Sequence, residues 1–88
     1  MTQEHREFYK KFRKDLGVTT SAKSFYMSID EIARLEKWVE EYIHLRYMTN
    51  HYGTVVTEYK LTNGIRFRLW PYTTPTHRAV AIVIPRKY

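Results

Sequence analysis

Basic side chains that alternate with aromatic rings are the residues of this sequence whose types and spacing suit a chemical task. A first series near the start of the chain fills four of five consecutive positions, namely Lys10, Lys11, Arg13 and Lys14. A second series lies in the last third of the chain and consists of Lys60, Arg66, Arg68, Trp70, Tyr72, Arg86 and Lys87. Lysine and arginine displace counterions from phosphates, and flat rings stack on exposed bases. Both series therefore predict a nucleic-acid interface, of DNA or RNA.

The charge of the chain is unevenly distributed. Its 88 residues carry 15 Lys and Arg against 9 Asp and Glu, a formal net charge of +6. Residues 1–29 have a net charge of +3 and residues 30–41 a net charge of −3. Residues 42–88 have a net charge of +6, because Glu58 is the only acid among them. A positive surface of this kind suits a nucleic acid, or an acidic protein or nucleoprotein.

Composition excludes several classes of site. Without cysteine the chain has no disulfide scaffold, thiol nucleophile or thiolate metal site. The apolar run 79–84 is far shorter than the ~20 residues of a membrane-spanning helix. Residues 1–16 are charged where a secretory signal is apolar. We expect one cytoplasmic domain over residues 1–88, with no membrane contact.

Four histidines are the remaining candidates for metal binding or catalysis, namely His5, His44, His51 and His77. His44 and His51 would share a face of a helix that continued to residue 51, and Glu40 could join them. Their spacing matches no HExxH motif, and no GxSxG motif or phosphate-binding glycine loop occurs. The sequence therefore predicts no metal, no cofactor and no catalytic residues.

Helical spacing of apolar residues indicates two helices. The first covers about residues 3–15, with Thr2 as its N-cap and Gly17 just beyond its end. Residues 16–27 have no helical period and predict a connecting loop. Ser28 and Glu31 form a capping-box pattern that begins a second helix over about residues 29–49.

Alternating apolar residues then indicate three strands, at about residues 54–61, 65–70 and 78–84. A three-residue turn between the first two pairs Tyr59 with Phe67 and Glu58 with Arg68, which keeps the apolar side chains on one face. This register predicts a type I turn with Gly64 as a left-handed bulge residue. It also places Lys60, Arg66 and Arg68 beside Trp70. The predicted fold class is α+β, with two helices followed by a three-stranded antiparallel meander (ααβββ).

The strand at residues 78–84 is apolar on both faces, which is unusual for a small sheet with one solvated face. Either both helices enclose this strand, or its second face meets a partner chain, as in a homodimer.

Two alternatives to nucleic-acid binding remain. Tyr, Trp and Arg are enriched at the centres of protein interfaces, so the same surface suits a small inhibitor or adaptor, of the kind that viruses and mobile elements carry.

The second alternative is a metal-independent ribonuclease. Residues 64–68 and 83–88 resemble the C-terminal half of RelE-type mRNA interferases, which cut ribosome-bound mRNA with Lys, Arg and Tyr. That family begins with a β-strand, whereas residues 1–16 here predict a helix. Our main expectation is a non-enzymatic binding domain.

Overall fold

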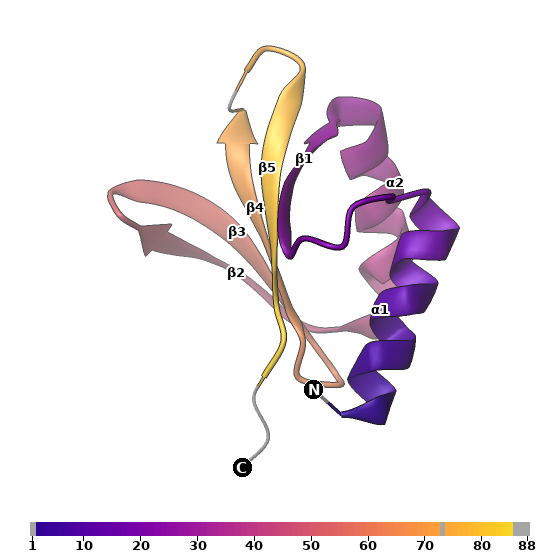
Figure 1. Cartoon of the computed structure of the whole chain (residues 1–88). Helices are drawn as coiled ribbons and strands as arrows, with labels where there is room; N and C mark the ends of the chain where they lie inside the picture. The colour runs from indigo at the N-terminus through magenta and orange to yellow at the C-terminus, as the bar shows by residue number, and fades with distance from the viewer. Residues whose placement is uncertain (1, 73, 86–88) are drawn as a thin grey trace.

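The computed structural model describes residues 2–72, without the side chain of Tyr72, and residues 74–85. Two helices and five strands follow one another as α1 (Gln3–Leu16), β1 (Ser24–Ser28), α2 (Ile29–Val39), β2 (Ile43–His51), β3 (Thr54–Leu61), β4 (Arg66–Tyr72) and β5 (His77–Val83). A 3-10 turn, Glu40–Tyr42, joins α2 to β2. The strands form one antiparallel sheet in the order β1-β5-β4-β3-β2. Both helices lie on the same face of this sheet, and the other face is open (Figure 1).

The first helix begins and ends at the signals that the sequence carries. The Thr2 hydroxyl accepts a hydrogen bond from the His5 amide at 3.1 Å. Gly17 has φ 68° and donates its amide proton to the Arg13 carbonyl, as a left-handed C-terminal residue does. Tyr9, Phe12 and Leu16 are buried against the rest of the molecule.

The second helix begins as predicted but ends much earlier. The capping box is present, because the Glu31 amide donates to the Ser28 hydroxyl at 3.3 Å and the Glu31 carboxylate accepts from the Ser28 amide at 3.1 Å. The predicted helix over 29–49 is wrong, since α2 ends at Val39 and residues 43–51 form β2. Pairing of β2 with β3 satisfies the backbone there, and this tertiary gain overrides the local helical spacing.

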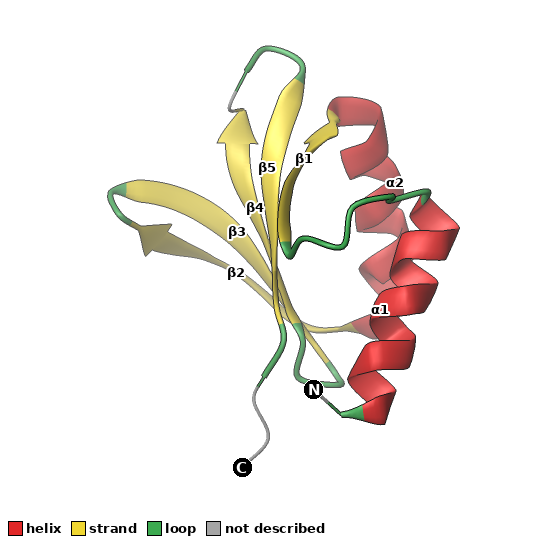
Figure 2. Cartoon of the chain, in the orientation of Figure 1, coloured by secondary structure: helices red, strands yellow, loops and turns green. Residues whose placement is uncertain are grey.

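The predicted loop over 16–27 is also wrong in its last part, because residues 24–28 form β1 and pair with β5. Phe25 and Met27 are the side chains that β1 directs to the core. The fold is therefore α+β but not a three-stranded ααβββ meander. The sheet has five strands, and α2 lies between β1 and β2 in the chain (Figure 2).

The predicted register between β3 and β4 is confirmed. Tyr59 pairs with Phe67 and Glu58 with Arg68. The Leu61 amide donates to the Ile65 carbonyl at 2.9 Å, so the turn between them has three residues. Gly64 has φ 88°, the left-handed conformation that the bulge position requires.

The hydrophobic core lies between the helices and one face of the sheet. At its centre, the ring centroid of Phe12 lies 5.2 Å from that of Phe67, edge to face. From β5, Val80 and Ile82 face this core. The alternate residues of β5 are half-buried on the opposite face, so the helices do not enclose the strand from both sides.

No helix in residues 2–72 and 74–85 is long and apolar enough to cross a membrane.

Candidate nucleic-acid interface

The sheet face opposite the helices brings together several of the predicted site residues. Side chains alternate between the two faces of a strand, so the neighbours of the core residues define this face. We call it the open face, and it includes Tyr26 from β1, Leu45, Tyr47, Thr49 and His51 from β2, Val56, Glu58 and Lys60 from β3, Arg66, Arg68 and Trp70 from β4, and Ala79, Ala81 and Val83 from β5. Its cations and aromatic rings come from β2, β3 and β4, which are neighbours in the sheet, and from β1, which β5 separates from β4.

Glu58 lies at the centre of the open face and is only 3% exposed. It is the one charged residue that is buried in the part of the chain that the structure describes. One carboxylate oxygen accepts a hydrogen bond from the Tyr47 hydroxyl. The other accepts from Arg68 Nε at 2.7 Å. Tyr47, Glu58 and Arg68 are direct cross-strand neighbours, so three strands build this cluster.

The ionisation of this cluster follows from its contacts. Burial raises the pKa of the Glu58 carboxyl, but the hydrogen bonds from Tyr47 and Arg68 and the charges of Arg68 and Arg66 lower it further, so the net pKa is below its ordinary value. The hydrogen bond to Glu58, burial and the carboxylate charge raise the pKa of Tyr47, and Arg66 opposes that rise. Near neutral pH the carboxylate is therefore charged and the phenol neutral.

The contact with Glu58 leaves Arg68 able to bind a second anion. The carboxylate occupies Nε, and the terminal nitrogens make no hydrogen bond to a described residue. The Arg68 side chain is 23% exposed. A guanidinium that is held at one nitrogen offers its other donors in a fixed orientation, which suits a phosphate.

Lys60 and Arg66 form the next cross-strand pair beside this cluster. Lys60 is exposed and Arg66 is half-buried. Neither makes an ion pair with a described acid. The open face thus carries three cations against Glu58, and a net charge of +2 among its described residues.

Trp70 provides an aromatic surface on the other side of the cluster. Its ring is half-buried, and its centroid lies 6.2 Å from that of His51 on β2. The Trp70 side chain therefore extends across β3 toward β2. Val56 of β3 lies on this face and not in the core beneath the helices, yet it is fully buried. The Trp70 carbonyl accepts from Arg78 Nε at 2.6 Å, which fixes the backbone where the β4–β5 register shifts. The open face thus combines the Trp70 ring, which packs beside His51, with three cations.

The basic residues of α1 lie on the other side of the molecule. α1 covers the core face of the sheet, so its solvent side is separated from the open face by both layers (Figure 1). Lys11 binds Asp15 at 3.1 Å. Arg13 is half-buried and donates through Nη2 to the Thr19 carbonyl at 3.2 Å. Lys10 and Lys14 are exposed, and with Lys11 and Arg13 they cannot form one continuous surface with Lys60 and Arg66.

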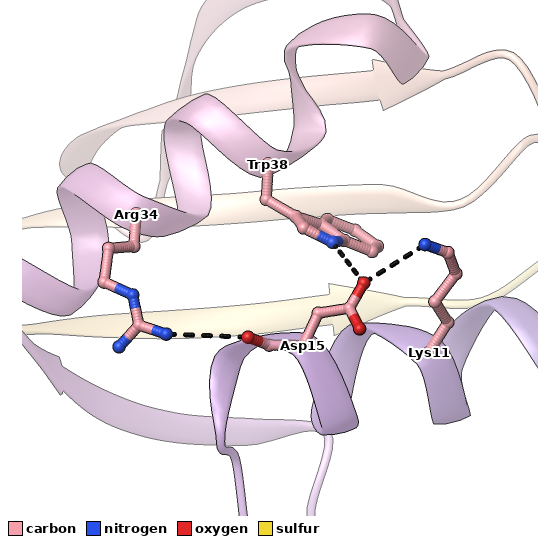
Figure 3. Close-up of polar contacts among 4 residues, drawn as sticks. All are labelled: Lys11, Asp15, Arg34 and Trp38. Carbon is pink, nitrogen blue, oxygen red and sulfur yellow. Dashed lines mark hydrogen bonds and ion pairs between the residues drawn. The ribbon is translucent and has the colours of Figure 1, made fainter.

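Figure 3 shows what part of this helix surface does instead. One oxygen of the Asp15 carboxylate accepts from Trp38 Nε1 at 2.9 Å and from Lys11 at 3.1 Å. Arg34 reaches the Asp15 carbonyl at 3.5 Å. The hydrogen bond from Trp38, followed by that from Lys11, lowers the pKa of Asp15. These contacts join the end of α1 to α2, so Lys11 and Trp38 have a structural task.

Three of the predicted site residues cannot be placed. Arg86 and Lys87, and the side chain of Tyr72, lie outside the residues that the structure describes. The predictions that involve them stay predictions.

The sequence did not group Tyr47, Tyr26 and His51 with the basic residues of the sheet, because Tyr47 fell in the predicted helix, Tyr26 in the predicted loop and His51 just beyond the helix end. The alternation of Ile43, Leu45, Tyr47 and Thr49 was the available signal for a strand. His44 and His51 do not share a helix face with Glu40, since both lie on β2. No group of three or more metal-binding side chains occurs among the described residues.

In comparisons with known proteins, no protein-family model, no curated protein and no solved structure matches the chain.

Proposed function

We propose that the open face binds nucleic acid that has unpaired bases, and that the protein does so in the cytoplasm. The observation that carries the proposal is the arrangement at the centre of the face. A buried carboxylate, Glu58, binds Arg68 through Nε, and the terminal nitrogens of Arg68 make no hydrogen bond to a described residue. A buried ion pair is weak evidence for stability, because desolvation offsets much of the attraction. A fixed cation on an uncovered surface is better explained by an anionic ligand.

Phosphate contacts are assigned to Lys60, Arg66 and Arg68, which lie on two neighbouring strands. Adjacent strands are about 4.8 Å apart, and side chains on one face of a strand repeat about every 6.8 Å. Nucleotide phosphates in an extended single strand have a similar spacing, so neighbouring phosphates can each meet a cation. Such contacts release counterions and weaken with added salt.

Base stacking is assigned to Trp70. Every base has a flat face, and stacking on an aromatic side chain contributes about 1–3 kcal/mol per base. A base inside a duplex cannot offer that face, so the open face should favour single strands. Tyr26, 63% exposed on β1, gives a second ring on the same face.

Two matched double variants test the proposal. Lys60→Ala with Arg66→Ala removes two charges from the open face, and Lys10→Ala with Lys14→Ala removes two from α1 on the other side. Fluorescence anisotropy with a labelled single-stranded oligonucleotide measures the affinity of each. We expect the first variant to lose affinity at least about tenfold more than the second, since only the first removes phosphate contacts. Equal losses in the two variants would contradict the proposal.

An acidic protein is a second candidate ligand for the same face. The observation in its favour is that Leu45 and Tyr26 are 51% and 63% exposed there, since apolar and aromatic side chains are enriched at protein interfaces. Salt separates the two candidates, because the logarithm of a phosphate-binding constant falls linearly with the logarithm of salt concentration. The mRNA-cleavage alternative, which invokes Lys, Arg and Tyr, has less support, because Tyr47, the tyrosine beside Arg68, donates its hydroxyl proton to Glu58 and its pKa is raised.

A further inference from the structure

The outer edge of the sheet at β2 has no strand partner among the described residues. β2 is nine residues long, whereas β1, at the opposite edge, has five. Natural edge strands are commonly protected by proline, lysine or other charges, because their free amides and carbonyls are a template for another strand. Residues 43–51 contain no proline, lysine or acid, and Arg46 is their only permanent charge. This edge is therefore open to pairing.

The turn that follows β2 shows which backbone groups face outward. Tyr52 and Gly53 have φ 54° and 85°, the two positive values of a two-residue hairpin turn. In such a hairpin the flanking pair, His51 and Thr54, is hydrogen-bonded, and bonded and non-bonded pairs then alternate. Arg46, Met48 and Asn50 consequently direct their amides and carbonyls away from β3.

We propose that a second copy of this chain occupies the edge, with β2 antiparallel to β2 of the partner copy and Met48 opposite Met48. The residues whose amides and carbonyls point away from β3 all have even numbers. The two strands can therefore form hydrogen bonds with each other only in a register that places even-numbered residues opposite one another. With Met48 on the two-fold axis, all three outward residues take part, since Arg46 then faces Asn50.

The side chains in this register are compatible with one another. Arg46 meets an amide rather than a second arginine, so no like charges lie opposite. Met48, 68% exposed, meets the same side chain of the second copy, and Leu45, 51% exposed, lies opposite His51. The pairing therefore covers two apolar side chains that the single chain leaves in water.

The predicted homodimer through residues 78–84 needs a different geometry. β5 is paired with β1 on one side and with β4 on the other, so it has no free edge. Pairing through β2 instead gives one continuous sheet, because the two-fold axis of antiparallel strands is perpendicular to it. The open faces of both copies then lie on the same side, with the two Tyr47 side chains near the axis.

Cysteine cross-linking tests the register, since the chain has no cysteine of its own. Met48→Cys places a thiol on the proposed axis. Val55→Cys is the matched control, because Val55 is also apolar and exposed (52%) but lies on β3, away from the edge. Directly opposed residues in a bonded antiparallel pair have a Cα separation of about 5.5 Å, which a disulfide spans. We expect Met48→Cys to form a disulfide dimer under mild oxidation about tenfold faster than Val55→Cys, which has no such opposed thiol.

Sedimentation equilibrium of the unmodified chain completes the test, with Met48→Pro as the blocking variant. Proline removes an outward amide and leaves the β3 pairing intact, so this variant should fold, with an unchanged circular dichroism spectrum, and be monomeric. A dimer that Met48→Pro dissociates, together with selective cross-linking at position 48, supports the proposal. A chain that stays monomeric at every concentration, a dimer that Met48→Pro leaves intact, or equal cross-linking of the two cysteine variants overturns it.

Discussion

Replacing Arg68 with methionine separates the charge of this residue from the packing of its stem. Methionine keeps an unbranched apolar side chain but removes the guanidinium that Glu58 binds at 2.7 Å. The variant leaves a carboxylate that is 3% exposed with the Tyr47 hydroxyl as its remaining described partner. We expect the free energy of unfolding to fall, and the loss to depend on pH.

The size of the loss follows from the burial of the two partners. Removing one partner of a fully buried ion pair costs about 3–5 kcal/mol. Here Glu58 is buried, but the Arg68 side chain is 23% exposed and the Tyr47 hydrogen bond remains. Partial access of water places the expected loss at the lower end, at about 3 kcal/mol near pH 7.

The pH dependence of stability should differ between the two proteins. In the native chain the pKa of Glu58 is lowered, so its contribution to stability is present above the ordinary pKa of a glutamate and is lost as the pH falls through the folded-state value. Without Arg68, its hydrogen bond and its charge no longer oppose the effect of burial, so we expect the pKa of Glu58 to rise above its value in the native chain. Protonation then destabilises the folded variant less than the native chain, so the difference between the two proteins should shrink below about pH 5.

Urea unfolding of both proteins at a series of pH values measures this difference. Arg66→Met is the matched control, because Arg66 lies two residues away on the same face and makes no ion pair with a described acid. It should cost less than about 1 kcal/mol at every pH. A loss in Arg68→Met that equals the control, or that stays constant with pH, would refute the role given to the buried carboxylate.

Three further predictions concern other parts of the fold. Burial, followed by the hydrogen bond to Glu36 at 2.7 Å, raises the pKa of Tyr59 to about 12. Spectrophotometric titration should show one tyrosine that ionises near that pH and is absent in Tyr59→Phe, and stability should fall as the pH rises from about 10. Gly17→Ala should lower the free energy of unfolding by about 1 kcal/mol, because φ is 68° there although no atom lies within 4 Å of the added carbon. In a Trp38→Phe background, a single-stranded oligonucleotide should quench the fluorescence of Trp70, and unchanged emission at saturation would contradict stacking.

The sequence was informative where local chemistry determines local structure. Thr2, Gly17 and Ser28 marked helix ends, since each supplies a hydrogen bond or a backbone conformation that few other residues can supply. The turn at Gly64 was predictable for a similar reason. Its register placed Glu58 opposite Arg68, and hence gave the centre of the candidate site.

The two outer strands were not found because their stability comes from distant partners. The three- and four-residue spacing of α2 continues through Tyr42 and Arg46, so this segment fits a helix as well as the 3-10 turn and the strand that it forms. Pairing of Arg46 with Tyr59 decides between them, and a window of neighbouring residues cannot contain that contact. β1 is too short to show a period, and it forms because β5 leaves an edge to be paired.

The candidate site was predicted in part for the same reason. Residues of β3 and β4 were grouped correctly, because one hairpin contains them. The basic residues of α1 joined that group only because they are basic, and the structure places them beyond the core. Tyr47 and His51 completed the group only once β2 was known to be a strand.

The proposed function requires Lys60, Arg66 and Arg68 to contact phosphates. The salt dependence of oligonucleotide affinity tests it most directly. Each phosphate contact with a single strand contributes about −0.7 to the slope of log K against log salt, so three contacts give about −2. The Lys60→Ala, Arg66→Ala variant should retain about −0.7, and the Lys10→Ala, Lys14→Ala control should retain the full slope. Equal slopes in the native chain and the first variant would contradict the account.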